Sequence, residues 1–173
     1  LLQDPRKEVR ARTAWIISRH SHKADRSLLL TTLPALKDSE AEVRSNMIRV
    51  LGNATEIPAI KTALEEVLRD SDENVRSLAA YTLLMNADRN HAAALDTLVS
   101  LFSSTNVHTR YFAAHYYTIS NPTNLRLETR LIPIYTNVLS VGNTNLQALA
   151  MRSLSRYGRR VQHVVPQLQE FLT

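Results

Sequence analysis

The residues best suited to catalysis or metal binding, histidine, serine and glycine, are not spaced for either. His20 and His22 are two positions apart, so on a helix they would point away from each other. His108 and His115 are two helical turns apart, roughly 10 Å by helix rise, which is too far to share one ion. The three glycines are isolated, which excludes a phosphate-binding loop, and no serine occupies a nucleophile elbow. We therefore expect no enzyme activity, no cofactor and no metal site.

Aromatic and basic residues recur at a regular interval instead. Successive spacings of 34, 32, 34 and 37 residues separate Trp15, Arg49, Tyr81, His115 and Arg152. Neighbouring positions one turn away supply further candidates: Arg19, Met85, Arg156 and Phe112. Trp, Tyr and Arg are enriched in binding hot spots, so elements stacked in register would align these side chains into a contact row for a partner. The alternative is that the aromatic residues simply fill the space between packed helices.

The same interval separates copies of a short motif in which an aspartate precedes a Val-Arg pair. Three copies begin at Asp4, Asp38 and Asp70, and their arginines are Arg10, Arg44 and Arg76. A weaker fourth copy ends at Arg110, and a decayed fifth copy has Gln147 in place of arginine. A fixed period in the range of about 20–50 residues is typical of a solenoid.

Each motif is followed by apolar and small residues at helical spacing. In the second copy they are Met47, Ile48, Val50 and Leu51, and in the first copy the same positions hold Thr13, Ala14, Ile16 and Ile17. This pattern predicts a helix with one buried stripe after every motif. Ser39 and Glu42 have the spacing of a capping box at the start of the second such helix. A second set of helices is expected over residues 25–37, 57–69, 91–102, 125–139 and 161–172.

The phrase Leu-x-Asp-Ser-x-x-x-Val-Arg, followed by an alanine-rich helix, resembles the HEAT repeat. The resemblance implies an all-α fold, a right-handed α-solenoid of about five stacked helical hairpins. It implies that the second helix of each hairpin lines a concave face. It also implies that the motif's aspartates and arginines form a structural ladder between repeats, made by Asp4, Asp38, Asp70, Arg10, Arg44, Arg76 and Arg110. The rung at the fifth copy should be missing.

We interpret residues 1–173 as a single HEAT-repeat domain that is a segment of a longer array. Its repeats are expected at about 1–24, 25–56, 57–90, 91–122 and 123–158, with a half repeat at 159–173. The apolar ends of such a segment would be open to self-association.

Charge is unevenly distributed along the chain. Residues 1–26 carry seven Lys/Arg and three Asp/Glu, residues 27–100 seven and eleven, and residues 101–173 seven and two. A protein-binding scaffold without catalytic activity, holding its partner on the concave face, is the favoured function. One alternative is a nucleic-acid binder with a concave face like that of HEAT-like DNA glycosylases, using the arginine-rich ends. Another is a HEAT-like lyase or chaperone subunit that acts on a chromophore protein.

The chain has no cysteine, which excludes disulfides and thiolate chemistry. We find neither a signal-peptide pattern nor an apolar run long enough to cross a membrane, and we expect no membrane span. The sequence does not name a compartment, and the cytoplasm is the default expectation.

Overall fold

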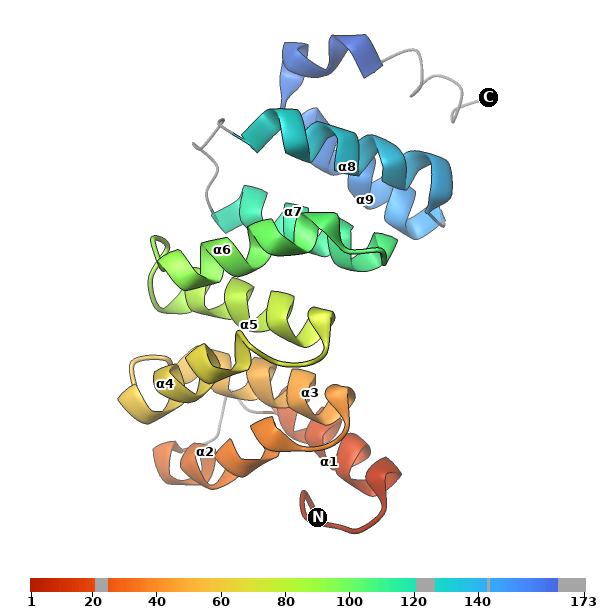
Figure 1. The fold of residues 1–173 in the computed structure, drawn as a ribbon. Coiled ribbons are helices and arrows are strands. Elements are labelled where there is room, and N and C mark those ends of the chain that lie inside the picture. The colour runs from red at the N-terminus through yellow and green to blue at the C-terminus, as the bar shows by residue number, and fades with distance from the viewer. Residues whose placement is uncertain (21–24, 121–126, 143, 165–173) are drawn as a thin grey trace. The chain divides into compact units, whose positions relative to one another are not determined.

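The computed structural model describes residues 1–20, 25–120, 127–142 and 144–164. It divides the chain into two compact units, residues 1–97 and residues 98–173. The described residues form α-helices and short 3-10 helices joined by turns, without a β-strand (Figure 1). The predicted all-α fold of sequential helical hairpins is therefore confirmed, whereas the handedness of a superhelix stays a prediction.

Residues 1–97 form helical hairpins in which a first helix is followed by a motif and a second helix. The second helices are α1 (Lys7–His20), α3 (Ala41–Leu51) and α5 (Glu73–Asn86). The first helices are α2 (Arg26–Thr32), continued by η2 (Leu33–Lys37), and α4 (Pro58–Val67). A short turn, η3 (Gly52–Ala54), follows α3, and α6 (Ala92–Ser100) crosses the boundary between the units. Helix α3 packs against both α1 and α5, so the three second helices form one layer.

The apolar stripe after each motif builds the core of this layer. Val43, Met47 and Ile48 of α3 are fully buried, as are Val75 and Ala79 of α5. Small side chains let these helices approach closely. A β-carbon added to Gly52 would lie 2.5 Å from Cγ2 of Thr82, so a larger residue at position 52 would push α3 and α5 apart.

Residues 98–173 repeat the same plan. The unit contains η4 (Leu101–Ser103), α7 (Val107–Ser120), α8 (Glu128–Val141), α9 (Thr144–Ser155) and η6 (Gly158–Val164). Helix α8 packs against both α7 and α9, and buried Tyr111, Leu131 and Tyr135 fill the space between them. Of the helix predicted over residues 161–172, only the part up to residue 164 lies within the described residues.

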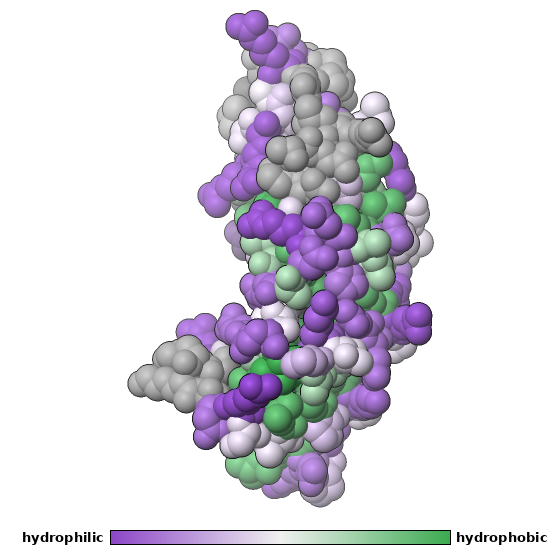
Figure 2. Space-filling view, turned by 90° about the vertical axis from the view of Figure 1, so that its left-hand side faces the viewer, coloured by the Kyte–Doolittle hydropathy of each residue, from purple (hydrophilic) through white to green (hydrophobic). Residues whose placement is uncertain are grey.

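Two local predictions are wrong. Ile16 was expected in the buried stripe but is 45% exposed, because the packing of α3 covers the Ala14 side of α1 and leaves Ile16 outside. Figure 2 shows hydrophobic residues at the surface near α2, and Leu28 and Leu30 of this helix are exposed.

The Ser39–Glu42 capping box does not form. The residue preceding α3 is Glu40, which makes no side-chain cap, and the Ser39 hydroxyl instead accepts a hydrogen bond from Arg10 at 3.1 Å. Oδ1 of Asp38 accepts the backbone N–H of Glu40 at 2.9 Å. The motif aspartate therefore orders the turn before the helix, which is the task that the sequence pattern had assigned to serine.

Candidate protein-binding face

Helical periodicity leaves one line of side chains on each second helix outside the core. In α3, the residues on either side of Arg49 are buried, whereas Arg49 itself is exposed. Trp15 is 42% exposed on α1, and Tyr81 is half-buried on α5. Because α1, α3 and α5 are neighbours in one layer, the three side chains occupy equivalent positions on adjacent helices.

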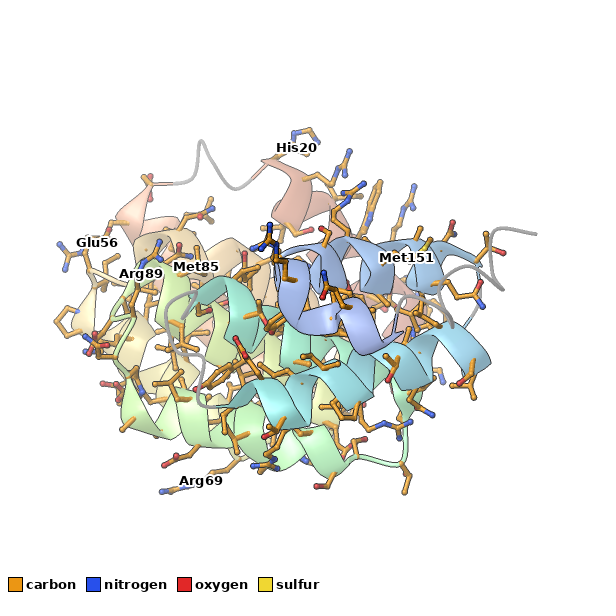
Figure 3. The ribbon with its side chains drawn as sticks, turned by 90° about the horizontal axis from the view of Figure 1, so that it is seen from above. His20, Glu56, Arg69, Met85, Arg89 and Met151 are labelled. Atoms are coloured by element: carbon orange, nitrogen blue, oxygen red, sulfur yellow. The ribbon has the colours of Figure 1, made fainter. Side chains whose placement is uncertain are left out.

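We call this surface the second-helix face of residues 1–97. It consists of Arg12, Trp15, Arg19, Arg49, Asn53, Tyr81 and Met85. Figure 3 shows that His20, at the end of α1, and Arg69, in the turn after α4, lie on opposite sides of this unit. Arg69 therefore marks the side that the second-helix face does not include.

Trp15 is flanked by two arginines of its own helix. The Cζ atom of Arg12 lies 4.6 Å from the centroid of the Trp15 ring, and that of Arg19 lies 5.8 Å from it. Residues three before and four after a helical position share its face, so the sequence spacing places both guanidiniums beside the ring. Cation–π attraction of about 0.5–1 kcal/mol at an exposed site favours this arrangement. Trp15 thus presents a large aromatic surface with a guanidinium group on either side.

The other predicted contact residues of this unit, Arg19, Arg49 and Met85, differ in how far they are exposed. Arg19 is exposed, and Met85 is half-buried one turn after Tyr81. Arg49 makes one long hydrogen bond, 3.5 Å from its Nη1 to Oδ1 of Asn46. The structure thus brings Trp15, Arg19 and Arg49 to the surface, while Tyr81 and Met85 also contribute to packing.

In residues 98–173, the predicted contacts separate into two groups. Arg152, on α9, and Arg156, in the turn that follows α9, are both exposed. Phe112 and His115 are half-buried on α7, where Phe112 makes an edge contact with Tyr111 at 5.2 Å.

His115 contacts side chains of both α7 and α9, and its role in partner binding stays a prediction. Its ring stacks on Tyr111 at 5.5 Å, and its Nδ1 lies 3.3 Å from Oγ of Ser153. Burial, followed by the charge of Arg156, lowers the pKa of His115 below its ordinary value. His115 is therefore neutral at pH 7, a state that suits a packed ring.

Two ion pairs join consecutive repeats beneath the surface. Arg10 donates to both carboxylate oxygens of Asp38 at 2.6 and 3.1 Å, and Arg44 donates to both of Asp70 at 2.7 Å. Each arginine also donates through Nη1 to backbone carbonyls of its own motif, such as those of Asp38 and Ser39 for Arg44. These bidentate contacts lock each turn to the repeat before it.

The ion pairs also shift the pKa values of their members. Burial opposes ionisation of Asp38, but hydrogen bonds from Arg10 and from the Glu40 N–H outweigh it and hold the pKa of that carboxyl below its ordinary value. The same bond from Arg10 raises the pKa of the guanidinium, and the bond to Asp70 raises that of Arg44. Both arginines thus remain charged in the folded protein.

The other predicted ladder residues behave differently. Asp4 pairs with Arg6 of its own turn at 2.9 Å, and hydrogen bonds from Arg6 lower the pKa of Asp4 to about 2. Arg76 lies 3.6 Å from Glu73 of its own helix. Arg110 donates to the side-chain oxygen of Asn137 at 2.8 Å, a partner that sequence reasoning missed because Asn137 lies outside the motif.

At the fifth copy there is no arginine to complete a rung. The side chain of Gln147 donates to the backbone carbonyl of Leu139 at 2.8 Å. An amide thus replaces the arginine and bonds locally.

A groove of about 900 Å³ lies between η2 and α4, on the side away from the second-helix face. Leu33, Leu36 and Ala63 contribute its apolar lining, and the exposed pair Lys37–Glu66 joins η2 to α4 at 3.2 Å. Among the described residues, no group of three His, Asp or Glu side chains gathers closely enough to hold a metal ion. The described helices are also too short or too polar for any of them to span a membrane.

The stacked hairpins, the recurring motif and the inter-repeat ion pairs define a helical-hairpin repeat protein. Residues 1–84 match the family described as HEAT repeats. The comparison with curated proteins finds no match.

Proposed function

We propose that this protein is a scaffold without catalytic activity, which binds a protein partner through the second-helix face of residues 1–97. The observation that carries the proposal is Trp15, a large aromatic side chain that is 42% exposed beside two arginines. Repeat proteins bind partners on extended surfaces made by equivalent positions of successive repeats. Trp and Arg are the residue types that most often dominate the binding energy of such surfaces.

The core of the unit does not require Trp15 to be a tryptophan. The corresponding positions on α3 and α5 hold Arg49 and Tyr81, which differ in size and charge, while the stripe beneath them stays apolar. A surface that varies over a constant core is what a partner-specific face requires. Residues that serve packing alone would keep similar size from repeat to repeat.

The test begins with capture of partners on the immobilised chain and their identification by mass spectrometry. The affinity of a purified partner is then measured for the wild type and for Trp15→Ala and Arg49→Ala. We expect Trp15→Ala to weaken binding by about thirtyfold, equivalent to ~2 kcal/mol.

Arg69→Ala is the matched control, because it removes an exposed arginine of the same unit outside the face. Unchanged far-ultraviolet dichroism in all variants would show that the fold is intact. Equal affinities for Trp15→Ala, Arg69→Ala and the wild type would reject the proposal.

A second candidate function rests on the charge of residues 98–173. This unit carries seven Lys/Arg and two Asp/Glu, and Arg152, Arg156 and Arg159 are exposed. We propose nucleic-acid binding by this unit as the alternative, and it predicts affinity that falls steeply with salt through counterion release. Titration of a labelled DNA duplex at low and high salt tests it, and weak binding at low salt would reject it.

A further inference from the structure

Three arginines of the second-helix face have no acidic partner among the residues that the structure describes. Within the described residues, no carboxylate lies at ion-pairing distance from Arg12, Arg19 or Arg49. By contrast, Arg10 and Arg44 have their charge neutralised by the ladder aspartates. The unit therefore distinguishes arginines used for folding from arginines left available at the surface.

Two of the available arginines are already held in place. Arg12 and Arg19 flank the ring of Trp15, although Glu8 lies one turn before Arg12 on the same helix and could have attracted it. A planar guanidinium over an aromatic ring keeps its N–H donors at its edges, where carboxylates bind bidentately. Such preorganisation reduces the side-chain entropy that binding an acidic group would otherwise cost.

The overall charge of the unit argues for a protein ligand over a nucleic acid. Residues 1–97 carry 14 Lys/Arg and 14 Asp/Glu, so the charges of the unit balance and it has no excess of positive charge. Nucleic-acid binding surfaces neutralise many phosphates and need a broad basic field. Two arginines beside Trp15 and a third, Arg49, on the neighbouring helix better match a short segment with a few carboxylates and an apolar side chain.

We infer that the partner presents an acidic segment to this face, with its carboxylates on Arg12, Arg19 and Arg49 and an apolar side chain against Trp15. The inference rests on the proposed function and names the chemistry of the partner. It predicts that a short anionic, apolar peptide binds this unit more tightly than its cationic counterpart.

Trp15 makes the inference directly measurable, because it is the single tryptophan of the chain. Its emission is followed during titration of the whole chain with three probes. They are a peptide of alternating glutamate and leucine, the same peptide with lysine in place of glutamate, and a single-stranded oligonucleotide. We expect the glutamate peptide to bind at least about tenfold more tightly than either other probe, through charge-assisted hydrogen bonds to the guanidiniums.

A charge reversal locates the binding. The variant R12E/R19E/R49E should lose at least about tenfold in affinity for the glutamate peptide and should come to prefer the lysine peptide. The matched control R26E/R69E/R89E changes the net charge equally at three exposed arginines of the same unit and should stay within about twofold of the wild type.

The possible outcomes separate this inference from the proposed function. Equal affinity for the two peptides, tighter binding of the oligonucleotide, or equal losses in the two triple variants would overturn the acidic-segment inference. If Trp15→Ala still weakened binding of the captured partner in that case, the proposed function would stand. Loss of both effects would reject the face as a binding surface.

Discussion

The two units connect their hairpins with different chemistry. In residues 1–97, ion pairs between Arg10 and Asp38 and between Arg44 and Asp70 join consecutive repeats. In residues 98–173, the equivalent arginine bonds to the neutral amide of Asn137. In this unit, hydrogen bonds among uncharged side chains also connect the helices, and we call these residues the neutral network. Its members are Tyr111, His115, Thr118, Tyr135, Ser153 and Tyr157.

The difference shows that the hairpin arrangement does not depend on charge. Helical packing of apolar and small residues is common to both units, whereas the polar connections vary. The ion pairs are sensitive to substitution, because a buried charge that loses its partner strongly destabilises the folded state. The neutral network should tolerate substitutions better, because a hydroxyl group can both donate and accept and can therefore bond to another partner. The units should therefore respond differently to substitution and to pH.

The largest expected effect is the removal of one member of a buried ion pair. The side chains of Arg44 and Asp70 are both 9% exposed, and Arg44→Ala would leave the Asp70 carboxylate without its partner. We expect a loss of about 3 kcal/mol in the free energy of unfolding of this unit. Urea unfolding followed by Trp15 emission measures it, since this tryptophan reports on residues 1–97 alone.

Lys37→Ala is the control, because the Lys37–Glu66 pair is 79% and 59% exposed and should contribute less than about 0.5 kcal/mol. The double variant R44M/D70L should be less destabilised than Arg44→Ala, since no buried charge remains. Equal losses for Arg44→Ala and Lys37→Ala would contradict the role given to the ion pair.

A smaller effect is expected in the neutral network. The buried hydroxyl of Tyr135 lies 2.8 Å from Oγ1 of Thr118, which also contacts the hydroxyl of Tyr157 at 3.2 Å. Tyr135→Phe should cost about 1 kcal/mol, because Thr118 keeps its other bonds. Hydrogen exchange of α8 measures the change, with Ser155→Ala on the exposed side of α9 as control. A loss as large as that of Arg44→Ala would remove the contrast between the units.

A still smaller change tests whether the chemistry of one unit can be transferred to the other. Asn137→Asp would place a carboxylate beside Arg110 and convert the neutral bond into an ion pair. Because Asn137 is exposed, we expect a gain of only about 0.5 kcal/mol, and it should decrease with added salt. Hydrogen exchange of α7 and α8 at two salt concentrations provides the measurement. Destabilisation at low salt would show that Arg110 does not accept a charged partner.

The last prediction concerns pH. The pKa of His115 is lowered in the folded protein, so its contribution to stability is present above the unfolded value of 6.5 and is progressively lost as the pH falls below it. The pKa of Asp38 is also lowered, so its contribution is lost only as the pH falls below 3.8. Acid should therefore loosen residues 98–173 first. Hydrogen exchange across this range tests the order, and His115→Gln should remove the earlier transition.

The sequence predicted the repeats well because their period is carried by the Val-Arg motif and the apolar stripe. The ion pairs of Arg10 and Arg44 were expected from the resemblance to HEAT repeats, which implied a ladder between successive repeats. Asn137 could not be predicted in this way, because it comes from a first helix without a repeated signature. The bonds of Tyr135 depend on the packing of three helices, which no local pattern encodes.

The candidate face was predictable in part. The interval between Trp15, Arg49 and Tyr81 indicated equivalent positions, and helical spacing indicated that Arg19 would lie near Trp15. The packing of His115 could not be anticipated, because it depends on Ser153 of another helix. Position within a repeat therefore indicates the side of a helix, whereas burial depends on the size of the neighbouring side chains.

The most direct test of the central claim asks whether one partner contacts all three second helices of residues 1–97. The chain has no cysteine, so environment-sensitive dyes can be attached at single sites after Asn53→Cys or Met85→Cys on the face, or Thr62→Cys on α4. On titration with the captured partner, Trp15 emission and the dyes at 53 and 85 should all change with one affinity, while the dye at 62 stays unchanged. A response at 62 with none at Trp15, 53 or 85 would contradict the account.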